Sequence, residues 1–102
     1  RHASQAGPAI RHLLDHAVRA YRAPGGAAYL VSSRGRPRLL CTAGEWVGEG
    51  AVSVEVGTGQ QTHGVIKLCP PRNGSHYTEA ELERLRAAAV LVAAAIEEDR
   101  SL

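Results

Sequence analysis

The longest regular pattern of apolar positions in the sequence lies in its last quarter. Apolar residues recur there at alternating spacings of three and four positions, which is typical of a helix that packs along one seam. The row consists of Leu82, Leu85, Ala89, Val92 and Ile96. Thr78 and Glu81 precede it with the spacing of a capping box, in which each residue bonds the backbone of the other. The pattern predicts a helix over 79–99.

A second amphipathic pattern runs from Ile10 to Tyr21, with apolar residues at i, i+3, i+4, i+7, i+8 and i+11. Arginine, histidine and aspartate fill the opposite side. Pro8 is well placed as the first helical residue, and the Pro-Gly-Gly run at 24–26 ends the pattern. We therefore expect a helix from Pro8 onwards, preceded by a frayed N-terminus at 1–7.

Four segments between these helices have the composition and alternation of β-strands. The clearest is 51–56, where valine alternates with alanine, serine and glutamate. The other three, at 27–33, 38–43 and 62–69, are short, apolar and bounded by glycine and proline. The order α-β-β-β-β-α predicts a single α+β domain over 1–102. In it, a four-to-five-stranded antiparallel sheet carries the N- and C-terminal helices on one face.

The second half of the chain resembles the closing part of a GAF domain. The resemblance rests on the valine-rich strand at 51–56, the glycine turn after it, and the Thr-His-Gly-Val-Ile-Lys-Leu strand at 62–68. The Tyr-Thr-Glu-Ala-Glu-Leu cap at 77–82 and a helix rich in leucine and alanine follow. The first helix and the hairpin at 27–43 fit the order of the family.

The resemblance implies a role in signalling, because GAF domains sense or relay signals. They commonly precede histidine kinases, cyclic-nucleotide enzymes or transcription regulators. We expect a regulatory or dimerisation domain of a bacterial signalling protein, specifically a two-component sensor histidine kinase, with no enzymatic activity in the domain itself. The charged residues at 97–102 would begin a linker helix into an output domain of the same chain.

One departure from the family bears on ligands. Ligand-binding members carry extra helices and loops between the middle strands, whereas only residues 44–50 separate the second and third strands here. We therefore expect no cofactor and carry over no ligand residues. Two alternatives stay open: a small-molecule sensor with its ligand on the sheet face, and a cysteine-based redox enzyme of the same fold.

The apolar rows of the two helices also predict a homodimer. One sheet face does not absorb every row, and Ala88, Leu91 and Ala95 add a second row beside the first. We expect the two terminal helices of each protomer to form a parallel bundle. The five seam residues named above, Leu82 to Ile96, would be its contact.

Composition changes this picture little. Hydrophobic residues make up 44% of the chain, charged residues 22%, and the net charge is +2, as in ordinary globular domains. No apolar run approaches the about 20 residues of a membrane span, and the N-terminus lacks the apolar region of a signal peptide. We predict a cytoplasmic protein that neither spans a membrane nor binds nucleic acid.

Few side chains indicate a catalytic or metal-binding site. Cys41 and Cys69 are interpreted as inert core thiols, with a redox pair as the alternative. His12 and His16 have metal-ligand spacing but lie on a polar helix face without further ligands, so no metal site is expected. The arginines at 34, 36 and 38 are interpreted as a solvated hairpin tip, with contact to phosphates or an acidic partner left open.

Overall fold

The computed structural model of the protein describes residues 6–100 of the chain, and side chains over residues 6–98. Its elements in chain order are α1 (Ala6–Ala20), β1 (Gly25–Val31), β2 (Pro37–Gly44), β3 (Val52–Gly57), β4 (Thr62–Leu68) and α2 (Glu79–Arg100). The predicted order of two helices and four strands is confirmed. Helix α1 begins two residues before Pro8 because Ala6 packs against the core. Residues 1–5 of the predicted frayed segment lie outside the described residues.

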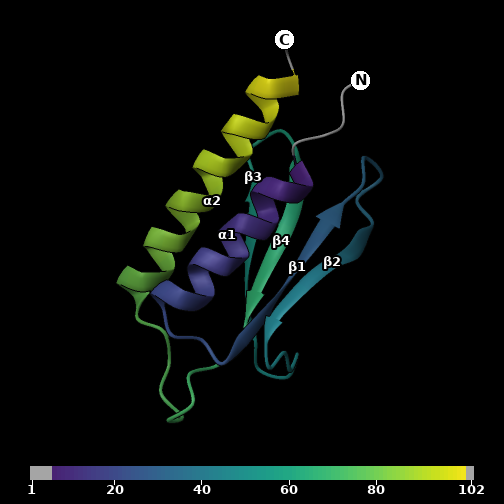
Figure 1. Ribbon diagram of the computed structural model, residues 1–102. Coiled ribbons are helices and arrows are strands. Elements are labelled where there is room, and N and C mark those ends of the chain that lie inside the picture. The colour runs from purple at the N-terminus through teal and green to yellow at the C-terminus, as the bar shows by residue number, and fades with distance from the viewer. Residues whose placement is uncertain (1–5, 101–102) are drawn as a thin grey trace.

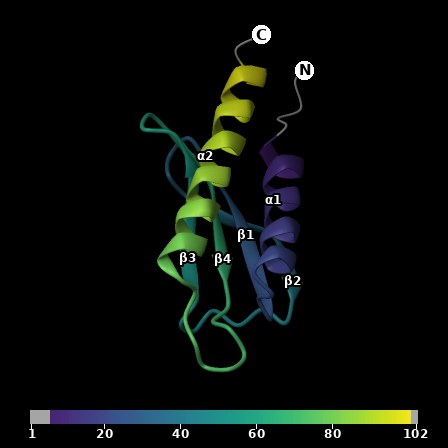
Figure 2. The same cartoon turned by 90° about the vertical axis from the view of Figure 1, so that its left-hand side faces the viewer.

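The four strands form one antiparallel sheet in the order β2-β1-β4-β3. Both helices lie on the same face of this sheet, so the predicted α+β layer arrangement is confirmed (Figures 1 and 2). Helix α1 packs mainly on β1, and α2 packs mainly on β3. The helices run in opposite directions, so α1 starts and α2 ends at the same end of the domain (Figure 1).

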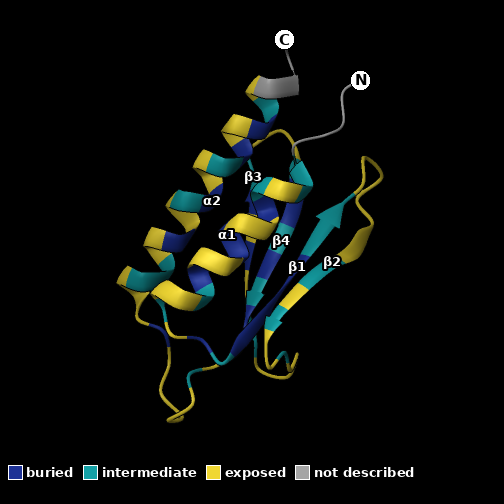
Figure 3. Cartoon of the chain, in the orientation of Figure 1, coloured by how far each residue is buried: buried dark blue, intermediate teal, exposed yellow. Residues whose placement is uncertain are grey.

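The core fills the layer between the helices and the sheet (Figure 3). The largest fully buried side chains come from both helices, β3 and β4: Ile10, Leu14, Val56, Ile66, Leu68, Leu85 and Ile96. Burial of each such side chain contributes about 1.5–3 kcal/mol to folding. The alternation seen in the sequence of β3 is therefore real, because Val54 and Val56 face the helices while Ser53 and Glu55 are exposed.

Two glycines set how closely α1 approaches the sheet. A methyl group on Gly64 would lie 2.6 Å from both Ile10 Cδ1 and the Tyr29 carbonyl oxygen, and one on Gly26 would lie 2.9 Å from a Leu14 methyl group. Any side chain at these positions would push α1 away from the sheet. The absence of side chains at Gly64 of β4 and Gly26 of β1 thus allows α1 to pack close to the sheet.

The N-terminus of α2 has the predicted capping box. The Thr78 backbone N–H donates to Glu81 Oε1 at 2.8 Å, and the Glu81 N–H donates to Thr78 Oγ1 at 3.1 Å. Tyr77, just before the cap, is buried, and its hydroxyl donates to the carbonyl oxygen of Cys69. The start of α2 is therefore fixed both by its own cap and by the end of β4.

Candidate functional site

The sheet face opposite the helices is the first candidate surface. By strand register it carries Tyr29, Leu39, Val65 and Lys67 in its central part. Leu39 is 53% exposed, and Lys67 Nζ lies 5.3 Å from the centre of the Tyr29 ring, a cation–π distance. Within residues 6–100 no helix lies on this face (Figure 2). It is a mixed apolar and charged surface, since the exposed Glu55 of β3 lies beside Val65 on the same face.

The 44–50 loop is held at the end of the sheet by Cys69. The Cys69 sulfur accepts the Val47 N–H at 3.3 Å, and the Glu45 N–H donates to the Pro24 carbonyl oxygen at 3.0 Å. Cys69 also donates its own N–H to Gly25. This buried thiol therefore has a structural role in joining the loop to β1 and β4.

The two cysteines do not lie on neighbouring strands. Both are free thiols, and β1 lies between β2, which carries Cys41, and β4, which precedes Cys69. Burial raises the pKa of the half-buried Cys41 thiol above its ordinary value, Arg11 partly offsets this, and Asp15 adds to it. A raised pKa lowers the fraction of reactive thiolate. The alternative of neighbouring, reactive cysteines is thus not supported by their placement.

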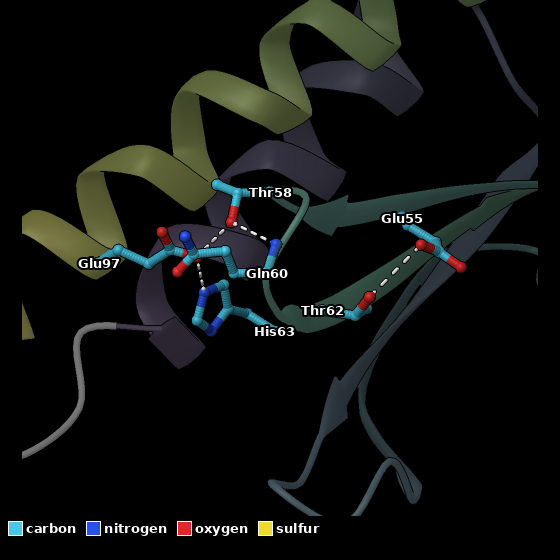
Figure 4. A network of polar contacts seen from close by, with 6 residues as sticks. All are labelled: Glu55, Thr58, Gln60, Thr62, His63 and Glu97. Carbon is cyan, nitrogen blue, oxygen red and sulfur yellow. Dashed lines mark hydrogen bonds and ion pairs between the residues drawn. The ribbon is translucent and has the colours of Figure 1, made fainter.

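A polar network connects the β3–β4 turn to the last part of α2 (Figure 4). His63 Nε2 lies 2.7 Å from Glu97 Oε2, and the Thr58 hydroxyl donates to the same carboxylate oxygen at 2.9 Å. The His63 side chain is 3% exposed and that of Glu97 34%. A nearly buried imidazole needs a hydrogen-bond partner, and the half-exposed carboxylate of α2 supplies it.

An irregularity in strand pairing places His63 in this network. Simple alternation would put His63 on the same face as Val65 and Lys67, away from the helices. However, β4 pairs Gly64 with Val56 and Thr62 with Gly57, so His63 is an extra residue on its strand. The resulting bulge turns the imidazole to the helix side.

This network is not evident from the pattern of residues along the chain. The two histidines with metal-ligand spacing, His12 and His16, are both exposed on α1. Among the described residues, no group of three or more His, Cys, Asp or Glu side chains is arranged to hold a metal ion. We therefore interpret the network as a structural connection between the β3–β4 turn and helix α2. Glu97, the first residue of the predicted linker helix, contacts the domain through Thr58 and His63.

Removing the Glu97 carboxylate is expected to loosen the last turns of α2. In the Glu97→Ala variant the buried His63 loses its acceptor, which costs about 1–3 kcal/mol. Amide hydrogen exchange should show faster exchange in the last turns of α2 and in the β3–β4 turn. Glu83→Ala is the control, because its exposed ion pair with Arg86 is worth at most about 1 kcal/mol. Equal changes of the exchange rates in the two variants would mean that the network does not couple the β3–β4 turn to α2.

The predicted seam residues of α2 lie inside the protomer. Leu85, Ala89 and Ile96 are at most 2% exposed, and Leu82 and Val92 are half-buried against the same core. Ala93, which the predicted row omitted, is fully buried. The row covers the sheet and so is not available as a dimer contact. The predicted row is an apolar face of α2, as the sequence indicates, but it packs into the core of the protomer. The prediction that this face forms the dimer contact is therefore corrected.

A different face of α2 is exposed and apolar. Val90 is 50% exposed and Leu91 is 72% exposed. Ala87 and Ala94 flank Leu91 at spacings of four and three residues, and both are exposed. Such small neighbours allow the backbones of two helices to approach closely. We call Ala87, Val90, Leu91 and Ala94 the outer row of α2. Leu91 is the one member that the sequence analysis had placed in its second row.

Comparisons with known proteins identify similar folds. The GAF-B domain of DevS from Mycobacterium smegmatis superposes with a TM-score of 0.79 at 14% identity, covering 94% of this chain and 96% of that one. The GAF domain/HD domain protein from Geobacter sulfurreducens gives 0.77 at 10% identity, with 97% and 96% coverage. The GAF domain from Acinetobacter phosphoenolpyruvate-protein phosphotransferase gives 0.73 at 11% identity, with 95% and 85% coverage. No protein-family model and no curated protein matches the sequence.

Proposed function

We propose that this chain, which has the fold of GAF domains, is a non-catalytic signal-relay domain of a cytoplasmic sensor histidine kinase in a bacterium. In this proposal the domain forms a homodimer, and a change at the sheet or its loops reaches an output domain of the same polypeptide through α2. The fold is established by the similar structures and their coverage. The relay role, the dimer and the type of parent protein are our inference.

The two-sided character of α2 supports this proposal most directly. One side of the helix is packed on β3 through Leu85, Ala89 and Ile96. The other side carries the outer row, in which Leu91 is 72% exposed. A helix with both sides apolar suits burial between its own sheet and a second copy. A shift of the sheet would then alter the contact between the two copies of α2.

The polar network gives the relay a second point of attachment. Thr58 in the β3–β4 turn and His63 in β4 both bond Glu97, near the end of α2. A displacement of that turn is therefore transmitted to the end of the helix from which an output domain would continue. None of the helices in residues 6–100 is both long and apolar enough to cross a lipid bilayer.

A small-molecule sensor is the second candidate function. The observation in its favour is the sheet face with the Tyr29 ring beside the Lys67 ammonium group, which suits an anionic aromatic compound. Against it stands the absence of any covering helix on that face within residues 6–100, because small-molecule sites usually bury most of the ligand surface. A saturable thermal shift with such compounds would favour the sensor.

The dimer is tested by the Leu91→Glu variant. Two carboxylates facing each other in an apolar contact should weaken dimerisation at least about 100-fold, the equivalent of about 2.7 kcal/mol. Sedimentation equilibrium measures this directly. Leu39→Glu is the matched control, because Leu39 is also an exposed leucine but lies on edge strand β2. If wild type and Leu91→Glu have the same association constant, the outer row is not the dimer contact.

A further inference from the structure

Positive charge is concentrated in the first part of the chain. Between residues 6 and 43 the chain carries six arginines and a single acidic residue, Asp15. Residues 44–98 carry eight glutamates and only four lysines or arginines. The net charge of +2 conceals this separation. We call the six arginines the basic flank: Arg11, Arg19, Arg22, Arg34, Arg36 and Arg38.

The arginines of the basic flank are exposed and form no ion pair with the side chains of residues 6–98. All six are exposed. In the part of the chain that the structure describes, none of their guanidinium groups forms an ion pair or a side-chain hydrogen bond. By contrast, Arg72 and Arg86 pair with glutamates. The guanidinium groups of the basic flank are therefore available to bind carboxylates or phosphates.

Helix α1 and strand β2 join these arginines into one surface. The two elements pack together, with Leu40 beside Gly7. Arg11 and Asp15 of α1 are both close enough to influence the Cys41 thiol of β2. Arg34 and Arg36 lie in the turn that leads into β2, and Arg38 lies within the strand. Arg11 of α1 and the three arginines of the β1–β2 hairpin thus lie on the same side of the domain, and Arg19 and Arg22 continue the positive charge along α1.

Strand β2 is poorly suited to pair with a strand of another protein. β2 is at the edge of the sheet, but it begins with Pro37, which has no N–H. Leu40 is an extra residue opposite the Ala28–Tyr29 step of β1, which makes a bulge. Both features hinder addition of a further strand. A partner on this side would accordingly be recognised by side chains.

We propose that the basic flank is a docking surface for an acidic protein. Guanidinium groups bind carboxylates with two parallel hydrogen bonds, so unpaired arginines recognise glutamate- and aspartate-rich surfaces. An acidic protein suits the basic flank better than nucleic acid, because Asp15 lies between Arg11 and Arg19 and interrupts the positive charge that a phosphate backbone would follow. This inference goes beyond the relay role and does not depend on the dimer.

The test uses a fluorescently labelled peptide of alternating glutamate and serine, with binding followed by anisotropy at low and physiological ionic strength. The variant replaces Arg34, Arg36 and Arg38 by glutamine. The control replaces Arg72, Arg84 and Arg86 by glutamine, which changes the net charge equally. Loss of three charged contacts should weaken binding about ten- to hundredfold. The control should bind within about threefold of wild type, because its arginines lie outside the basic flank.

Three results would overturn the proposal. One is an absence of peptide binding by the wild-type chain at low ionic strength. Another is an equal loss in the two triple variants, which would mean that only net charge matters. A third is tighter binding of duplex DNA than of the peptide at physiological ionic strength, which would assign the basic flank to nucleic acid. Circular dichroism of both variants checks that the fold is retained.

Discussion

Replacing Leu85 by glutamate is expected to unfold the domain. Leu85 is 2% exposed, in the layer between α2 and the sheet. Loss of a buried leucine side chain costs about 2–5 kcal/mol, and a carboxylate without a partner in the core adds several kcal/mol more. This sum is comparable to the whole stability of a typical domain, about 5–15 kcal/mol. Urea unfolding followed by circular dichroism should show no cooperative transition.

Leu91→Glu provides the matched control six residues further along the same helix. The same substitution there, at a side chain that is 72% exposed, should change the unfolding free energy of the protomer by no more than about 0.5 kcal/mol. The two variants therefore separate the core face of α2 from its outer row. A Leu85→Glu protein that keeps a native spectrum and a cooperative transition would contradict the packing of α2 described above.

Replacing Gly64 by valine is expected to have the second largest effect. A methyl group at this position would already lie 2.6 Å from the Tyr29 carbonyl oxygen, a backbone atom of the neighbouring strand, and from Ile10 of α1. Valine adds further bulk, so α1 must lift from the sheet. Overpacking of this kind typically costs about 1–3 kcal/mol and occasionally more, which the urea midpoint would report.

Gly59→Val is the control for that prediction. Gly59 lies in the β3–β4 turn, and a methyl group there would meet no atom within 4 Å. Its unfolding free energy should stay within about 0.5 kcal/mol of wild type. Equal stability of the Gly64→Val and wild-type proteins would mean that α1 does not rest on β4 as described.

The elements of this fold were predictable because their local signals are strong. The capping box at Thr78 and Glu81 forms as the sequence indicates, and the valine alternation of β3 matches its burial. The position of His63 was not predictable. It depends on one extra residue in the pairing of β4 with β3, and pairing register is a tertiary property that alternation alone cannot specify.

What covers each apolar helix face was the second feature that could not be predicted from the sequence. A periodic row of leucine and alanine indicates an apolar face, but it does not say whether a sheet or a second helix covers that face. In α2 the sheet takes the predicted row, and Leu91 on the other side remains exposed. Likewise, the net charge hides a separation into a basic and an acidic segment, which appears when charges are counted along the chain. Only the folded chain shows that α1 and β2, which carry the arginines, are neighbours.

Native mass spectrometry of the wild-type chain over a range of concentrations tests the relay account most directly. The account predicts a dimer with the mass of two unmodified chains, in a proportion that rises with concentration, and a monomer for Leu91→Glu. A wild-type monomer at every concentration would contradict it. If that monomer also carried added mass, a bound small molecule would make the sensor the better description of this domain.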